Sequence, residues 1–223
     1  MASLPSEPVS PREFMEDVVP AFFAEVELDE GERAVDFKLG VCLRGAGGGE
    51  WTLHFVEGEL GIIEGRATEC AITLVQSVDD WRAAIWEGRP GLVADVVRRV
   101  AEAGPRGLAP PGLDAPPRDP AAAFESLGNL QGMVEGIVAS AGAADWRLAV
   151  LIGPGPVPET AHATLRIGAD QAEALRRGEL HPLEALITGA LRLEGDLGLI
   201  LQLQAMAMTA SMSSPLSSPS PGR

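Results

Sequence analysis

The sequence predicts an α+β protein, because segments in which every second residue is apolar occur between segments with helix start and stop signals. A helix start is clear at residues 10–13, with Ser10 as the cap, Pro11 at the first helical position and Glu13 three residues after the cap. The clearest alternation lies at residues 34–44, where the apolar positions are Val35, Phe37, Leu39, Val41 and Leu43.

In the first half we expect the helix that starts at Ser10 to kink at Pro20. The strand at residues 34–44 then forms a hairpin with a strand at residues 51–55, across a glycine-rich loop. Residues 72–74 carry a third strand, followed by a short helix that Asp79 or Asp80 caps. A further helix is expected from Val93.

In the second half we expect a helix from about Ala121 to Ala141, then strands around residues 146–150 and 165–167. Two short helices follow at residues 170–178 and 182–189. Two closing strands are expected from Ala190 to about Gln204. A three-residue loop, Gly195 to Leu197, would bury one leucine face, because it pairs Leu193 with Leu199 and Leu191 with Leu201.

Composition divides the chain into a loose N-terminus, two halves, a Pro/Gly-rich linker and a disordered Ser/Pro tail. The predicted boundaries are 1–9, 10–103, 104–120, 121–209 and 210–223, in the order N-terminus, first half, linker, second half and tail. The segment Asp36–Val41 parallels Asp145–Val150. We interpret this as a degenerate internal duplication, and the pattern leaves open whether the halves form one composite body or two domains.

The chain is strongly acidic, with 32 acidic against 17 basic residues and a formal charge of −15. This balance disfavours nucleic acid, which requires a basic surface, and we expect no such partner. The start lacks the features of a secretory signal, and no apolar run approaches the roughly 20 residues of a membrane span. We therefore expect a cytoplasmic protein in which Cys42 and Cys70 are free thiols.

No pattern of catalytic or metal-binding residues is present in the sequence. His54, His162 and His181 are widely separated, and Ser140 does not lie in a nucleophile-elbow motif. The glycines at residues 45–49 lie between two strands, whereas a phosphate-binding loop opens a helix. We therefore predict no catalytic residue, no metal site, no cofactor and no enzymatic activity.

Residues 163–208 resemble the sterol carrier protein 2 family. The resemblance depends on the strand Ala163–Ile167, on Gly178 and Pro182 at the ends of two helices, and on the run Gly189–Asp196 that leads into Leu197–Leu203. Residues 22–104 are similar to the same family as a weaker, degenerate copy. The resemblance implies a mostly antiparallel five-stranded sheet covered by helices, with an apolar tunnel between sheet and helices in which family members bind lipids without catalysis.

Under this resemblance, the predicted lipid-binding residues are apolar side chains of the closing strands, the two helices and a C-terminal lid: Leu175, Leu186, Ile187, Leu191, Leu193, Leu199, Leu201 and Met206. The predicted function is binding and transfer or presentation of a sterol, fatty acid, acyl-CoA or isoprenoid. The alternative is an interaction or scaffold protein whose cavity is filled by side chains. The lipid's identity, a transient membrane or enzyme partner and the oligomeric state are left open.

Overall fold

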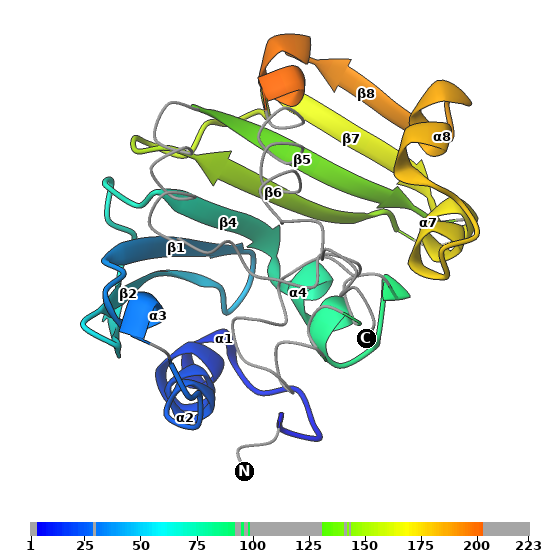
Figure 1. Cartoon of the computed structure of the whole chain (residues 1–223). Coiled ribbons are helices and arrows are strands. Elements are labelled where there is room, and N and C mark those ends of the chain that lie inside the picture. The colour runs from blue at the N-terminus through cyan, green and yellow to red at the C-terminus, as the bar shows by residue number, and fades with distance from the viewer. Residues whose placement is uncertain are drawn as a thin grey trace, which may run out of the picture.

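The computed structural model describes residues 4–28, 30–91, 95, 98, 131–140, 142 and 144–202. Its main feature is one sheet, with strand order β3-β2-β1-β4-β6-β5-β7-β8 (Figure 1). The first half supplies β1 (Phe37–Arg44), β2 (Gly49–Val56), β3 (Glu59–Glu64) and β4 (Ile72–Ser77). The second half supplies β5 (Gly132–Ala139), β6 (Trp146–Ile152), β7 (Ala163–Gly168) and β8 (Leu191–Gly195).

The α+β class is confirmed, but the expected five-stranded, mostly antiparallel sheet is wrong. The sheet has eight strands and is mixed, because β1 is parallel to β4 and β5 is parallel to β7. The two halves join where β4 pairs antiparallel with β6, with Ile72 opposite Ile152 and Val75 opposite Ala149. The sequence predicted several strands individually, but this pairing links segments more than seventy residues apart and has no local signal.

The N-terminal helical segment begins as the sequence predicts. The Ser10 hydroxyl accepts a hydrogen bond from the backbone N–H of Glu13 at 3.2 Å, and Pro11 is the first residue of α1 (Pro11–Glu13). The chain stays helical through a π-helical turn (Phe14–Val18) and α2 (Val19–Phe23), which contains Pro20. A short α3 (Glu30–Arg33) precedes the sheet.

In both parallel strand pairs, β1 with β4 and β5 with β7, the second strand leads directly into a helix. β4 runs into α4 (Val78–Ile85), and β7 runs into α7 (Ala169–Arg176). The cap of α4 is Ser77, whose hydroxyl accepts a hydrogen bond from the Asp80 N–H at 3.0 Å, so the expected Asp79 or Asp80 cap is wrong. After α7 the chain forms α8 (Pro182–Ile187) and then β8.

The helix expected from Ala121 to Ala141 is wrong over residues 132–139, which form β5 between β6 and β7. A strand with neighbours on both sides and buried residues on both faces lacks strict alternation, so its apolar residues resemble a buried helix in sequence. The strand β3 was also missed. The two-residue turn at Glu57 and Gly58, both with positive φ, is the signal for it.

The second closing strand is also wrong, because residues 197–202 are helical. The Asp196 side chain caps this turn by accepting hydrogen bonds from the N–H groups of Gly198, at 2.9 Å, and Leu199, at 3.2 Å. β8 pairs with β7 instead, placing Leu193 opposite Leu165 and Leu191 opposite Ile167. The expected leucine hairpin is therefore replaced by an edge strand and a helical turn.

The arrangement of strands recurs in the two halves. In each half a first strand lies between an antiparallel second strand and a parallel strand that leads into a helix: β1, β2, β4 and α4, then β5, β6, β7 and α7. This topology equates β1 with β5, whereas the sequence parallel matched β1 with β6. The internal duplication and the domain boundaries stay predictions, and the proposed linker and Ser/Pro tail lie outside the described residues.

Candidate functional site

One face of the sheet is apolar along its whole width and carries the helices, and we name it the helix face. α4 contacts β1, β4 and β6, and α7 contacts β5 and β7. Residues that are paired across neighbouring strands point to the same face of the sheet. One such row of partners on the helix face runs from β2 to β5 and consists of Leu53, Leu39, Ile72, Ile152 and Gly132. The opposite face carries ion pairs such as Lys38–Glu69, in which Nζ and Oε1 are 2.8 Å apart, and also buried apolar residues such as Val75 and Leu151 on its central strands.

Helices cover the helix face of β4–β8 at two ends. At one end Val138, Trp146 and Ile167 are buried against small residues of α4 and α7, including Ala84 and Ala172. At the other end Val134, Ile152 and Ala163 are buried together with Leu199 from the helical turn at residues 197–202. Each end is a core cluster, and we call the strand segments that lie between the buried residues of the two clusters the floor.

Six apolar residues of this face are only half-buried, and we name them the apolar strip. Leu148 packs against the edge of the first cluster, and Val150 and Leu165 pack against the edge of the second. The strip consists of Ile72, Leu74, Leu148, Val150, Leu165 and Leu193. Burial changes along β6 in this way: Trp146 and Ile152 are buried, while Leu148 and Val150 between them are half-buried. A continuous row of half-buried apolar side chains is what a site for an elongated apolar ligand requires.

Gly136 lies at the centre of this strip, opposite Leu148 on one side and Leu165 on the other. Within the part of the chain that the structure describes, a Cβ at this position would meet only the Leu148 carbonyl oxygen, at 3.7 Å, which is an ordinary contact distance. Neither the backbone conformation nor a close contact therefore requires a glycine at residue 136. Because glycine has no side chain, the apolar surface is lower at the centre of the strip by the size of one side chain.

The structure brings some of the predicted lipid-binding residues together and separates others. Leu193 lies on the strip, while Leu175 and Leu191 pack beside the cluster at the α7 end. Leu199 is buried in the other cluster, over Gly132. The remaining residues do not line the floor: Ile187 and Leu201 are 77% and 62% exposed, Leu186 is half-buried in α8, and Met206 lies outside the described residues.

The sequence analysis predicted the strands β4, β6 and β7, but it did not include any of their residues among the predicted lipid-binding residues. Leu148, Val150 and Leu165 alternate with polar or small residues, which marks one buried face. The sequence gives no indication that this face meets the leucines of β8, because that depends on the order of strands in the sheet.

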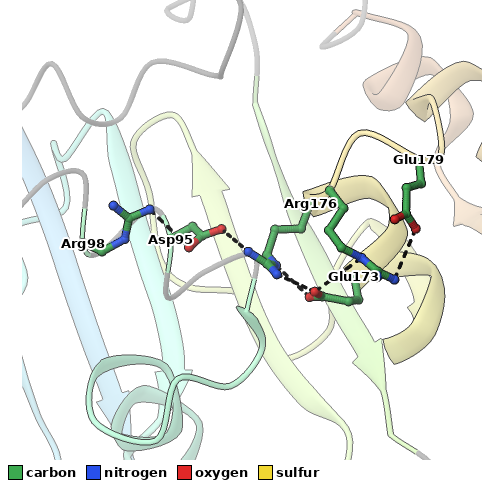
Figure 2. Close-up of polar contacts among 6 residues, drawn as sticks. Asp95, Arg98, Glu173, Arg176 and Glu179 are labelled. Atoms are coloured by element: carbon green, nitrogen blue, oxygen red, sulfur yellow. Dashed lines mark hydrogen bonds and ion pairs between the residues drawn. The ribbon is translucent and has the colours of Figure 1, made fainter.

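Arg176 and Arg177, at the end of α7, are held by carboxylates, and Figure 2 shows Arg176 between Asp95 and Glu173. Arg176 forms ion pairs with Asp95, at 3.0 Å, and with Glu173, at 2.5 Å. Hydrogen bonds from Arg176 lower the pKa of both carboxyl groups below their ordinary values. The network ties the second half of the chain to residue 95, so its role is structural.

Acid–base and metal chemistry receive no support from the described residues. No group of three or more His, Cys, Asp or Glu side chains in the described part of the chain could hold a metal ion. Cys42 and Cys70 are buried free thiols, as expected, and burial is the main cause that raises the pKa of Cys42. His162 is engaged structurally, since its Nδ1 accepts a hydrogen bond from the Met133 N–H at 2.9 Å.

No helix in the described ranges combines the length and apolar character that crossing a membrane requires. The fold and the site thus define an α+β protein with one helix-covered sheet face and an apolar floor between two packed ends.

Comparison with known proteins confirms the predicted resemblance. Residues 130–208 match the SCP-2 sterol transfer family. The match extends the predicted segment back through β5 and β6, but it does not include residues 22–104, so the weaker copy there is not confirmed. None of the curated proteins matches the sequence significantly.

The similar solved structures are sterol carrier proteins. Sterol carrier protein 2 like 2 from Aedes aegypti is 18% identical, with a TM-score of 0.30, and the alignment covers 52% of this chain and 95% of that chain. Sterol carrier protein 2 from Yarrowia lipolytica is 19% identical, with a TM-score of 0.29, covering 42% and 83%. A ubiquinone synthesis protein, UbiJ-SCP2, is 13% identical, with a TM-score of 0.24, covering 87% and 90%.

Proposed function

We propose that this protein binds an elongated lipid on the helix face and carries or presents it without catalysing a reaction. The observation that carries the proposal is the apolar strip, whose residues on β6, β7 and β8 lie within the segment that matches a sterol transfer family. The ligand lies along Leu148, Val150 and Leu165, with Leu193 and the residues of β4 at its flanks.

The energetics favour a covered site over an exposed patch. Transfer of a sixteen-carbon chain out of water is worth roughly 12 kcal/mol, at about 0.8 kcal/mol per methylene. A flat sheet recovers only part of this free energy, because one side of the ligand stays in water. Side walls such as the Leu199 and Trp146 clusters increase the contact area, so the strip is a better lipid site than the isolated exposed leucines of the surface.

The proposal includes a cytoplasmic location and a transient membrane or enzyme partner from which lipid is received. The absence of a catalytic role is also proposed. It is supported by the chemistry of the strip, since its side chains contain no group able to transfer a proton or attack a carbonyl. A scaffold role, in which side chains fill the space above the strip, is the competing outcome of the experiment below.

The experiment is titration of the purified chain with a fluorescent fatty acid. We expect saturable uptake at one site per chain, and competition by unlabelled fatty acid or sterol. Mass spectrometry of an organic extract of the purified protein then identifies the natural ligand. A correctly folded protein that takes up none of the lipids tested would support the scaffold role and exclude the lipid-carrier role.

A further inference from the structure

A pocket whose chemistry differs from that of the apolar strip lies at the carboxyl ends of the parallel strands β5 and β7. It has a volume of about 300 Å³, and its lining includes Arg166, Arg192, Gly168, Gln171 and Gly189. The end of a parallel strand pair is where open α/β sheets most often bind ligands. The volume is at the lower end of the range for small-molecule sites, which fits a small ligand or one group of a larger ligand.

The two arginines of this pocket face each other directly. Arg166 of β7 and Arg192 of β8 form a cross-strand pair in the antiparallel ladder, so their side chains leave the same face of the sheet. Like charges in this position repel each other, and the repulsion destabilises the edge strand. An anion placed between the two guanidinium groups converts that repulsion into two attractive contacts.

Among the described residues, carboxylates neutralise only one of the two cations. An Arg166 nitrogen lies 2.8 Å from Asp145 Oδ2, which lowers the pKa of that carboxyl group. Arg192 is exposed and has no carboxylate within ion-pair distance among the described residues. Arg33, Arg44, Arg66 and Arg82 likewise have no carboxylate within ion-pair distance among the described residues. Arg192 differs from them because it lines this pocket, directly across the ladder from a second arginine.

Backbone donors reach the same pocket. α7 begins at its lining, with Gly168 as the cap residue, and no side chain caps the first N–H groups of this helix. Gly189 and Ala190 contribute little bulk on the other side. Donors therefore converge from β7, from β8 and from the start of α7. A phosphate group has enough acceptor oxygens to meet all three, whereas a carboxylate has two oxygens in one plane.

We propose that this pocket binds a phosphate group, with Arg192 as its principal ligand and Arg166 as the second. The phosphate belongs either to a soluble phosphorylated compound or to the headgroup of a phospholipid, since both present the same chemistry. The site is separate from the apolar strip, because Arg166 and Arg192 lie at the opposite-face positions of β7 and β8. The proposal therefore does not depend on lipid binding by the helix face.

The test is titration of the full chain with inorganic phosphate, followed by the amide NMR resonances of residues 168–171. We expect saturable shifts of these amides, and Arg192→Gln should weaken binding at least about tenfold, because it removes a charge-assisted hydrogen bond. Ala190→Glu, which places a carboxylate at the pocket, should have the same effect. Arg12→Gln is the matched control: it removes one positive charge beside β3, at the other edge of the sheet, and should leave binding unchanged.

The source of the phosphate is distinguished by co-sedimentation with phosphatidylcholine vesicles with and without phosphatidic acid. Binding that requires both phosphatidic acid and Arg192 assigns a headgroup; phosphate binding without vesicle binding assigns a soluble ligand. The proposal is overturned if the amides of residues 168–171 do not respond to phosphate, or if Arg192→Gln binds phosphate as the unmodified chain does. It is also overturned if acetate at equal ionic strength gives the same response as phosphate.

Discussion

Replacing Gly136 with leucine is expected to lower the affinity for a fatty acid more than tenfold while leaving the fold intact. The added side chain occupies the lowest point of the apolar strip, between Leu148 and Leu165. Displacing two methylenes of the ligand from this floor costs about 1.6 kcal/mol, which corresponds to about fifteenfold in the dissociation constant. The measurement is the titration with a fluorescent fatty acid.

The fold should tolerate this substitution for two reasons. Gly136 does not have a positive φ, and its hypothetical Cβ is not closer than 3.7 Å to any group of the described residues. Leucine also suits a strand better than glycine does. Ala149→Leu is the matched control, because it adds bulk to the opposite face of β6, across from Val75 and Glu135. Equal lipid affinity for both variants would mean that the ligand does not lie on the strip.

Replacing Trp146 with alanine is expected to reduce the free energy of unfolding by about 3–5 kcal/mol. Trp146 starts β6 in the second half, but it is buried against Ala83 and Ala84 of α4 in the first half. Its indole N–H donates a hydrogen bond to the Asp80 carbonyl oxygen at 2.8 Å. The substitution therefore leaves a cavity and removes this hydrogen bond at the junction between the halves.

Urea denaturation followed by circular dichroism measures this loss of stability. Trp146→Phe separates the two contributions, because it keeps most of the packing and removes the hydrogen bond; we expect it to lose only about 1–2 kcal/mol. A loss below about 1 kcal/mol for Trp146→Ala would contradict the view that this side chain joins the two halves.

Local signals in the sequence were sufficient for elements that depend on their own residues. The Ser10 cap, the alternation at residues 37–44 and the apolar positions of β6 and β7 were all predicted, because capping and one-sided burial leave a short-range pattern. β5 was mistaken for a helix because it is flanked by strands on both sides, and burial on both faces removes that pattern.

The site could be predicted only in part for the same reason. Leu193 was found because it lies in the segment that resembles the family, whereas its neighbours on the floor come from β4, β6 and β7. The order of strands decides which apolar residues meet, and that order results from long-range pairing. The sequence analysis placed Asp196 in a hairpin turn. An acidic residue before an apolar run can also cap a helix, and in the structure Asp196 caps the helical turn at residues 197–202.

The most direct measurement is methyl NMR of the protein with a fatty acid that carries a nitroxide spin label on its chain. The account predicts that the methyl signals of Leu148, Val150 and Leu165 are broadened as the label is titrated. The signal of Ile63, an exposed side chain on the opposite face of the sheet, should remain sharp. Broadening of Ile63 with no effect on the strip would contradict the assignment of the lipid to the helix face.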